Sequence, residues 1–141
     1  MTDSTLSILL VEDDDVAAEA VARSLARNGV DFPVVWAEDG QAALTILRGQ
    51  NGRHKIARPR IVLLDLNMPR MNGFEFLAAI RADSRLKDEV VFVLTTSDID
   101  ADRTRAYQEQ IAGYMVKANV GPQFAKLAEL FRAYREAVCL P

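Results

Sequence analysis

Several apolar stretches of this 141-residue chain end in polar groups that could act together in one reaction. In the clearest case, residues 61–64 read Ile-Val-Leu-Leu and run directly into Asp65. A short, unbroken apolar run rich in Val and Ile is typical of a strand that is buried on both faces. A carboxylate at the end of such a strand is costly to bury unless another group compensates its charge. The rest of the chain must therefore supply those compensating groups.

The other strand-like stretches end in side chains of the required kinds. In an open parallel sheet, ligands bind outside the carboxyl ends of the strands, so we expect these groups to meet at one edge. Clustered carboxylates repel one another unless a cation lies between them, and oxygen ligands suit a hard divalent cation such as Mg²⁺. The groups are Glu12, Asp13 and Asp14 after the first stretch, Asn67 behind Asp65, Thr95, Thr96 and Ser97 after the fourth, and Lys117 after the fifth.

A cation, a hydroxyl and an ammonium around one carboxylate are the counter-charges that a transferred phosphoryl group needs. Asp65 is then the candidate nucleophile, and it would become an aspartyl phosphate. Taken alone, each of these residues has a simpler interpretation, because acids such as Asp14 often cap helices and lysines are usually solvated. The hypothesis therefore depends on the whole set meeting at one edge.

Five strand-like stretches alternate with five helix-like stretches, and this order positions the polar groups. Such alternation predicts an α/β fold, a doubly wound parallel sheet with right-handed crossovers and helices on both faces. Pro69 ends the third strand, and the pair at 72–73 indicates a turn. The expected strands are 6–11, 33–37, 61–64, 90–94 and 112–116; the expected helices are 16–28, one opening at 39–40, 73–82, 100–110 and 121–138.

Length, charge and composition limit the class of protein. The chain is long enough for one domain, 1–141, and we expect no attached output domain. A net charge of −3 with scattered basic residues argues against nucleic-acid binding. Cys139 is the single cysteine, so an internal disulfide cannot form. With neither a signal sequence nor an apolar stretch of membrane-spanning length, we expect a cytoplasmic protein without membrane partners.

Five motifs together resemble the receiver domain of two-component response regulators, over essentially the whole chain. This resemblance implies the flavodoxin-like (CheY-like) fold with strand order 2-1-3-4-5, and a signalling protein rather than an enzyme. The matching stretches are Ile-Leu-Leu-Val-Glu-Asp-Asp at 8–14, Leu-Leu-Asp-Leu-Asn-Met-Pro at 63–69, Met-Asn-Gly at 71–73, Val-Leu-Thr at 93–95 and Tyr-Met-Val-Lys at 114–117.

The resemblance assigns roles to the acidic residues. It implies that Asp65 accepts a phosphoryl group from a phosphohistidine on a sensor histidine kinase. Asp13 and Asp65 would bind Mg²⁺ directly, with Mn²⁺ as a substitute. Glu12 would act on the metal through water, and Asn67 would lend its backbone carbonyl.

The resemblance also implies a switch. Lys117 would pair with Asp65 or its phosphate, and Thr95 would bond a phosphate oxygen. Thr95 would move toward the phosphate and Tyr114 would then turn inward, which is a bistable element biased by new charged hydrogen bonds. Residues at the positions of Asn67 and Ser97 tune how fast the phosphate is lost to water.

A finer resemblance points to the stand-alone receivers that serve phytochrome-type histidine kinases. It rests on the loop 49–59 and on residues 82–87 and 94–97. It implies a bacteriophytochrome partner and signalling by phosphorylation-dependent docking, dimerisation or relay to a downstream or phosphotransfer protein. A homodimer would form through the fourth helix, fifth strand and fifth helix. Some residues of the last helix lie partly off its apolar, core-facing stripe. They could form a dimer contact or be ordinary half-buried side chains; these residues are Leu130, Tyr134, Ala137 and Val138.

Two alternatives and one departure accompany this interpretation. A phosphotransfer enzyme of the haloacid-dehalogenase type also uses an aspartyl phosphate, but it needs a second acid where this chain has Asn67. A receiver-like adaptor that is never phosphorylated is the other alternative.

The departure from the family pattern is Ala118, because receivers usually carry a cis proline after the lysine. A cis bond before a non-proline costs roughly 2.5–4 kcal/mol, so we expect a trans bond in an altered loop or a strained cis bond.

Overall fold

The computed structural model describes residues 6–50, 56–120 and 124–141. Its centre is a parallel five-stranded sheet with the order β2-β1-β3-β4-β5. This confirms the doubly wound α/β fold and its flavodoxin-like strand order. The strands are β1 (Ser7–Val11), β2 (Val34–Ala37), β3 (Arg60–Leu64), β4 (Val90–Thr95) and β5 (Gly113–Val116).

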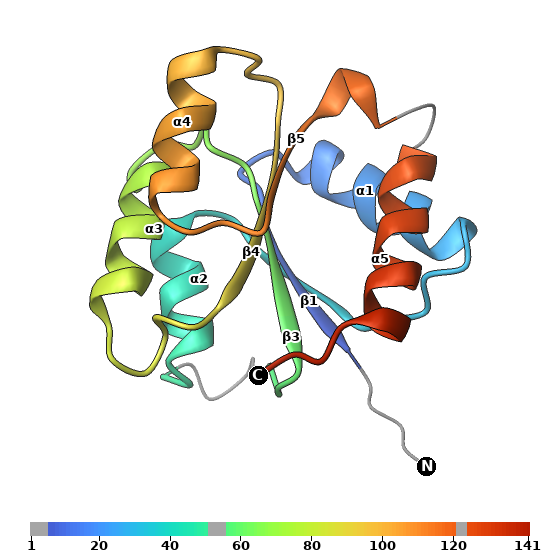
Figure 1. The fold of residues 1–141 in the computed structure, drawn as a ribbon, viewed down its shortest axis with the longest axis horizontal. Coiled ribbons are helices and arrows are strands. Elements are labelled where there is room, and N and C mark those ends of the chain that lie inside the picture. Colours follow the sequence, from blue (N-terminus) through green and yellow to red (C-terminus); the bar gives the residue numbers. More distant parts are fainter. Residues whose placement is uncertain (1–5, 51–55, 121–123) are drawn as a thin grey trace.

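Helices cover the sheet on both sides. In Figure 1, α2, α3 and α4 lie on one side of the sheet and α1 and α5 on the other, so the domain has three layers. A short 3-10 helix, Lys117–Asn119, follows β5. The five helices are α1 (Asp15–Arg27), α2 (Gly40–Leu47), α3 (Gly73–Ala82), α4 (Asp100–Gln108) and α5 (Ala125–Ala137).

Burial of the sheet on both faces explains its unbroken apolar strands. In β1, Leu9 and Val11 join the core under α2, α3 and α4, whereas Ile8 and Leu10 join the core under α1 and α5. Every residue of β3 is buried. Since successive side chains of a strand point to opposite faces, a strand between two helical layers needs apolar residues at every position.

Side-chain caps start three of the helices directly after the strands or loops of the carboxyl edge. The Asp14 carboxylate accepts the backbone N–H of Val16 at 2.9 Å, which confirms the capping interpretation of Asp14. Asp39 caps α2 in the same way. Asn72 and Glu75 form a reciprocal capping box, so the expected turn at 72–73 consists of the N-cap and the first residue of α3.

Most element ends fall within one or two residues of the expected ones. Helix α4 stops at Gln108, two residues early, because Gln110 adopts a positive φ of 62° that a helix cannot continue. Helix α5 begins at Ala125, directly after the left-handed Phe124. The face of α5 that packs on the sheet is buried at Leu127, Ala128 and Phe131. The parts of the predicted loop 49–59 and of the predicted last helix that fall at 51–55 and 121–123 lie outside the described residues.

The amino edge of the sheet, opposite Asp65, is held by a buried ion pair. Arg60 at the start of β3 donates to Glu89, which precedes β4, with Nε 3.0 Å from Oε1. Its Nη1 also donates to the Ile56 carbonyl at 2.8 Å, and Arg58 adds a second guanidinium 3.1 Å from Glu89. Both Arg60 and Glu89 are buried, so each depends on the other for compensation of its charge.

Glu89→Ala should therefore lower the free energy of unfolding by about 3–5 kcal/mol, because it leaves Arg60 charged and unpaired in the interior. The measurement is urea denaturation, with unfolding monitored by circular dichroism. Asp88→Ala is the matched control, since Asp88 is exposed and its contact with Arg58 should contribute at most about 1 kcal/mol. Equal unfolding midpoints for the two variants would contradict this prediction.

Candidate functional site at the carboxyl edge of the sheet

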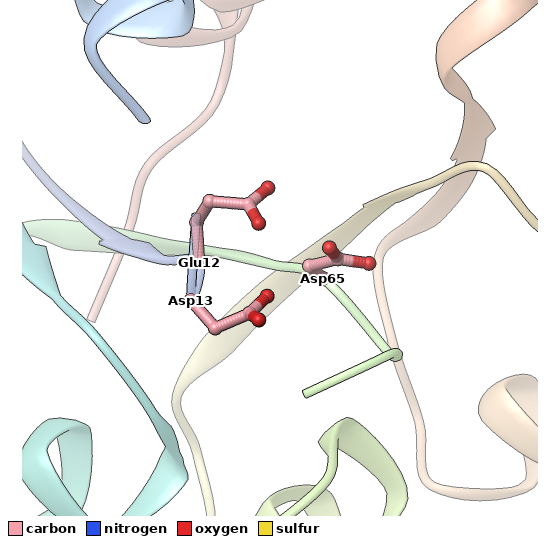
Figure 2. A group of neighbouring side chains, drawn as sticks. All are labelled: Glu12, Asp13 and Asp65. Atoms are coloured by element: carbon pink, nitrogen blue, oxygen red, sulfur yellow. The ribbon is translucent and has the colours of Figure 1, made fainter. Parts of the chain in front are cut away.

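Strands β1 and β3 deliver three acids to one place. Val11 and Leu64 are register partners, so the two strands end level with each other. The Asp65 N–H donates to the Val11 carbonyl at 3.0 Å, which places Asp65 beside Glu12 and Asp13. Figure 2 shows the three side chains directed into the same space, two from the end of β1 and one from the end of β3.

The three carboxyl groups are close enough to share one ion. One oxygen from each of Glu12, Asp13 and Asp65 lies within 4.8 Å of the others. Glu12 and Asp65 are buried, whereas Asp13 is exposed. Burial is the main cause that raises the pKa of Glu12 above its ordinary value. The negative charge of Asp65 raises this pKa further, while the hydrogen bond from Lys117 opposes the shift.

Lys117 reaches this cluster from the end of β5. Its ammonium lies 2.9 Å from Glu12 Oε1 and 3.8 Å from Asp65 Oδ2. The structure thus brings Lys117 to Asp65 as expected, but Glu12 is its nearer partner. This is a consequence of burial, because the Glu12 carboxylate has little contact with solvent and needs a positive charge at hydrogen-bond distance.

The bond between Lys117 and Ala118 is trans. Over residues 6–50, 56–120 and 124–141, a cis peptide occurs at Arg58–Pro59 alone. Of the two expected outcomes for Ala118, the structure has the trans bond, and a 3-10 turn forms over residues 117–119. The Lys117 ammonium still reaches the acidic cluster, so a cis proline is not needed to place it.

The loop after Asp65 is positioned by a close backbone approach. The Asn67 N–H donates to Asp65 Oδ1 at 3.3 Å, and Asn67 itself is exposed. A Cβ at Gly73 would lie only 2.6 Å from Leu66 Cα and 2.8 Å from the Asp65 carbonyl oxygen. Glycine is therefore required where α3 begins. The sequence indicated that a helix starts at Gly73. It did not indicate the close approach to Leu66 and Asp65 that makes glycine necessary there.

The expected switch residues form one connected group at the β4–α4 loop. Thr95 is fully buried at the end of β4, and its hydroxyl oxygen accepts the Ser97 N–H at 3.4 Å. The half-buried Tyr114 donates its hydroxyl to the Ser97 carbonyl at 3.1 Å. Ser97 in turn donates its hydroxyl to Asp102 of α4 at 2.6 Å. Thr96 is exposed and takes no part.

Two aromatic residues near the site were missed by the sequence analysis. The indole N–H of Trp36 donates to the Glu12 carbonyl at 2.7 Å. The Tyr107 hydroxyl oxygen accepts the N–H of Tyr114 at 3.2 Å. Both contacts join a side chain to the backbone of a distant segment, and neither residue belongs to a recognisable motif.

The donor set fits a divalent cation. All three side chains offer carboxylate oxygens, which Mg²⁺ and Mn²⁺ prefer over Zn²⁺-type nitrogen and sulfur ligands. One lysine alone leaves the three acids with excess negative charge, and a cation between Asp13 and Asp65 would compensate it.

None of the described helices is long and apolar enough to cross a bilayer.

Mg²⁺ should raise the unfolding temperature of the wild-type protein, because a ligand that binds only the folded state stabilises it. The gain is about 2.7 kcal/mol at a concentration one hundred times the Kd. Asp13→Asn should abolish most of this gain, as measured by thermal unfolding with and without Mg²⁺. Asp14→Asn removes a neighbouring charge but keeps a good helix cap, so it should retain the gain. Equal losses in both variants would indicate general charge screening instead of a defined site.

Comparison with known proteins identifies the family. The family described as the response regulator receiver domain matches residues 8–129. The chain is 42% identical over 110 residues to the probable methanogenesis regulatory protein FilR2 of Methanothrix harundinacea, covering 78% of this chain and 70% of that protein. It is 34% identical over 135 residues to the response regulator Rcp1 of Synechocystis, covering 95% and 92% of the two chains.

Solved structures agree with this assignment. The Mn²⁺-bound form of Rcp1 superposes with a TM-score of 0.80 at 33% identity, over 96% of this chain and 98% of the other. The phosphorylated cyanobacterial phytochrome response regulator RcpA superposes with a TM-score of 0.82 at 33% identity, over 98% and 99% of the two chains. With its fold, its acidic cluster and these similarities together, the chain belongs to the response regulator receiver domain family of two-component signalling proteins.

Proposed function

We propose that this protein is a stand-alone response regulator that accepts a phosphoryl group on Asp65 from a phosphohistidine of a sensor histidine kinase. The observation that carries this proposal is the convergence of three carboxyl groups within 4.8 Å, with the Lys117 ammonium 3.8 Å from Asp65. Asp65 lies at the carboxyl end of a fully buried strand, where an open parallel sheet binds its ligands.

In the proposed reaction, an Asp65 carboxylate oxygen attacks phosphorus as the phosphorus–nitrogen bond of the donor breaks. Lys117 offsets negative charge on Asp65 and on the incoming group, and it is already within 3.8 Å. Asp13 and Asp65 would hold Mg²⁺ directly, Glu12 through water, and Asn67 with its carbonyl. The bound ion would supply further charge neutralisation for the phosphoryl oxygens. The divalent ion in the Rcp1 structure supports this part of the proposal.

The proposed switch begins at Thr95. Among the described residues, its hydroxyl oxygen accepts one long contact, from the Ser97 N–H at 3.4 Å, so a phosphate oxygen can compete for it. Tyr114 contacts Ser97 in the same loop, and the Ser97 hydroxyl contacts Asp102 of α4. Movement of Thr95 would therefore alter the loop, Tyr114 and the start of α4 together. Asn67 contacts Asp65 through its N–H, and Ser97 contacts Thr95; their side chains would set the access of water to the phosphate.

We assign a phytochrome-type kinase as the partner on the basis of relatives. RcpA is a phytochrome response regulator, and it resembles this chain over nearly the full length of both. The Rcp1 match spans 95% of this chain and 92% of that protein, which supports one receiver domain over the matched length. A cytoplasmic location and transfer of the signal to a downstream or phosphotransfer protein complete the proposal. A haloacid-dehalogenase-type enzyme is not favoured, because residue 67 is Asn and the family match is to receivers.

Incubation with acetyl phosphate and Mg²⁺ should add one phosphoryl group to the wild-type protein, because the proposed nucleophile Asp65 lies beside both the acidic cluster and the Lys117 ammonium. Intact-protein mass spectrometry measures this addition. Asp65→Asn should show no addition, and Asp14→Asn should behave as the wild type. Phosphoryl transfer from a phytochrome-type kinase should show the same pattern. An Asp65→Asn variant that is still phosphorylated would rule out the assignment, and an unmodified wild type would favour the adaptor alternative.

We also propose a homodimer through the face formed by α4, β5 and α5. Ile99, directly before α4, is 60% exposed, and Tyr107 on α4 is exposed beside the edge strand β5. Leu130 of α5 is also exposed, as is Val138 just past the end of α5, whereas Tyr134 packs edge-on against Phe92. Exposed apolar side chains along an unpaired strand are typical of an association surface.

Ile99→Asp should weaken association, because it places a charge in the proposed apolar contact. Sedimentation velocity with and without beryllofluoride, a phosphoryl mimic, measures the monomer–dimer equilibrium in each state. Val16→Asp is the matched control, since Val16 is 73% exposed on α1, on the other side of the sheet. The face is wrongly assigned if Val16→Asp, but not Ile99→Asp, yields monomers.

A further inference from the structure

The acidic pair is tied to a residue of the neighbouring edge strand. Trp36 lies in β2, and it is the only tryptophan of the chain. Its indole N–H donates to the backbone carbonyl of Glu12 at 2.7 Å, a short and direct hydrogen bond. The Trp36 side chain is nevertheless 44% exposed, so burial alone does not hold it in this position.

This contact holds the last part of β1 on its β2 side. The Glu12 N–H donates to the Ala37 carbonyl at 3.0 Å, which continues the parallel ladder one residue beyond the strand. The indole then binds the Glu12 carbonyl, so both backbone groups of Glu12 have partners on β2. Past this point the chain turns into α1, whose cap is Asp14.

The orientation of the Glu12 carbonyl also sets the direction of Asp13. The carbonyl belongs to the planar peptide group that joins Glu12 to Asp13, so rotating it would move the Asp13 Cα and its side chain. Asp13 is exposed, whereas Glu12 has Lys117 as an additional anchor. Among the contacts of the described residues, the indole bond is therefore the one that restrains this peptide group between two proposed metal ligands.

We propose that Trp36 is a positioning residue, which orients Glu12 and Asp13 for a divalent cation through its indole N–H. This inference rests on the proposed function, in which those acids hold the metal. A simpler role is that the ring only covers the apolar groove between α1 and β2, which is lined by Leu10, Val16 and Val34. The two roles differ in one atom, because phenylalanine can cover the groove but cannot donate the hydrogen bond.

The experiment compares Mn²⁺ affinity in wild type, Trp36→Phe and Val16→Ala by electron paramagnetic resonance of free Mn²⁺. Trp36→Phe should weaken binding about two- to tenfold, which corresponds to the loss of one neutral hydrogen bond. Val16→Ala removes apolar surface from the same groove but leaves the indole hydrogen bond in place, so the Mn²⁺ affinity of this variant should equal that of the wild type. Equal affinity in Trp36→Phe, or equal weakening in Val16→Ala, overturns the inference. A wild type that binds no Mn²⁺ overturns the metal site itself, and the inference with it.

The wild-type protein supplies a second readout without any change at position 36. The indole N–H has its own resonance in a nitrogen–proton correlation spectrum, and we expect this resonance to shift along the Mg²⁺ titration. In Asp13→Asn the resonance should stay constant over the same range. An indole signal that does not move while the wild-type protein saturates with Mg²⁺ contradicts the proposed coupling.

Discussion

The structure depends on one electrostatic constraint, the placement of three carboxyl groups within 4.8 Å at the mouth of a buried sheet. Two of them, Glu12 and Asp65, have little access to water, and burial raises the pKa of Glu12. Lys117 compensates part of the charge through contacts with both. In the proposed function, the remaining excess of negative charge would attract a cation, and the cation would in turn compensate the charge of an incoming phosphoryl group.

The fold satisfies this constraint by rigid backbone geometry rather than by flexible side chains. The register of β1 and β3 brings the acids level, and the Asp65 N–H is fixed on the Val11 carbonyl. Gly73 lets α3 begin against the backbone of Asp65, where any side chain would collide. The two helical layers in Figure 1 bury both faces of the sheet, so the strand ends cannot shift independently.

Sequence reasoning found the strands and the acids, because unbroken apolar runs such as residues 61–64 have few other interpretations and end in polar groups. The strand order came from family resemblance, since alternation alone leaves several topologies open. The closer pairing of Lys117 with Glu12 rather than Asp65 could not be predicted, because it depends on which carboxylate is more deeply buried. The Trp36 and Tyr107 contacts were missed for a related reason. Each joins a side chain to the backbone of another segment, and no periodicity or spacing encodes such a contact.

The central claim is that one divalent cation binds between the acids of β1 and the acid of β3. Anomalous diffraction from crystals soaked in Mn²⁺ tests it directly, because the ion is located without assumptions about its ligands. We expect a single strong peak at bonding distance from carboxylate oxygens of both Asp13 and Asp65. A peak elsewhere on the surface, with the space between these two carboxylates filled only by water, would contradict the account.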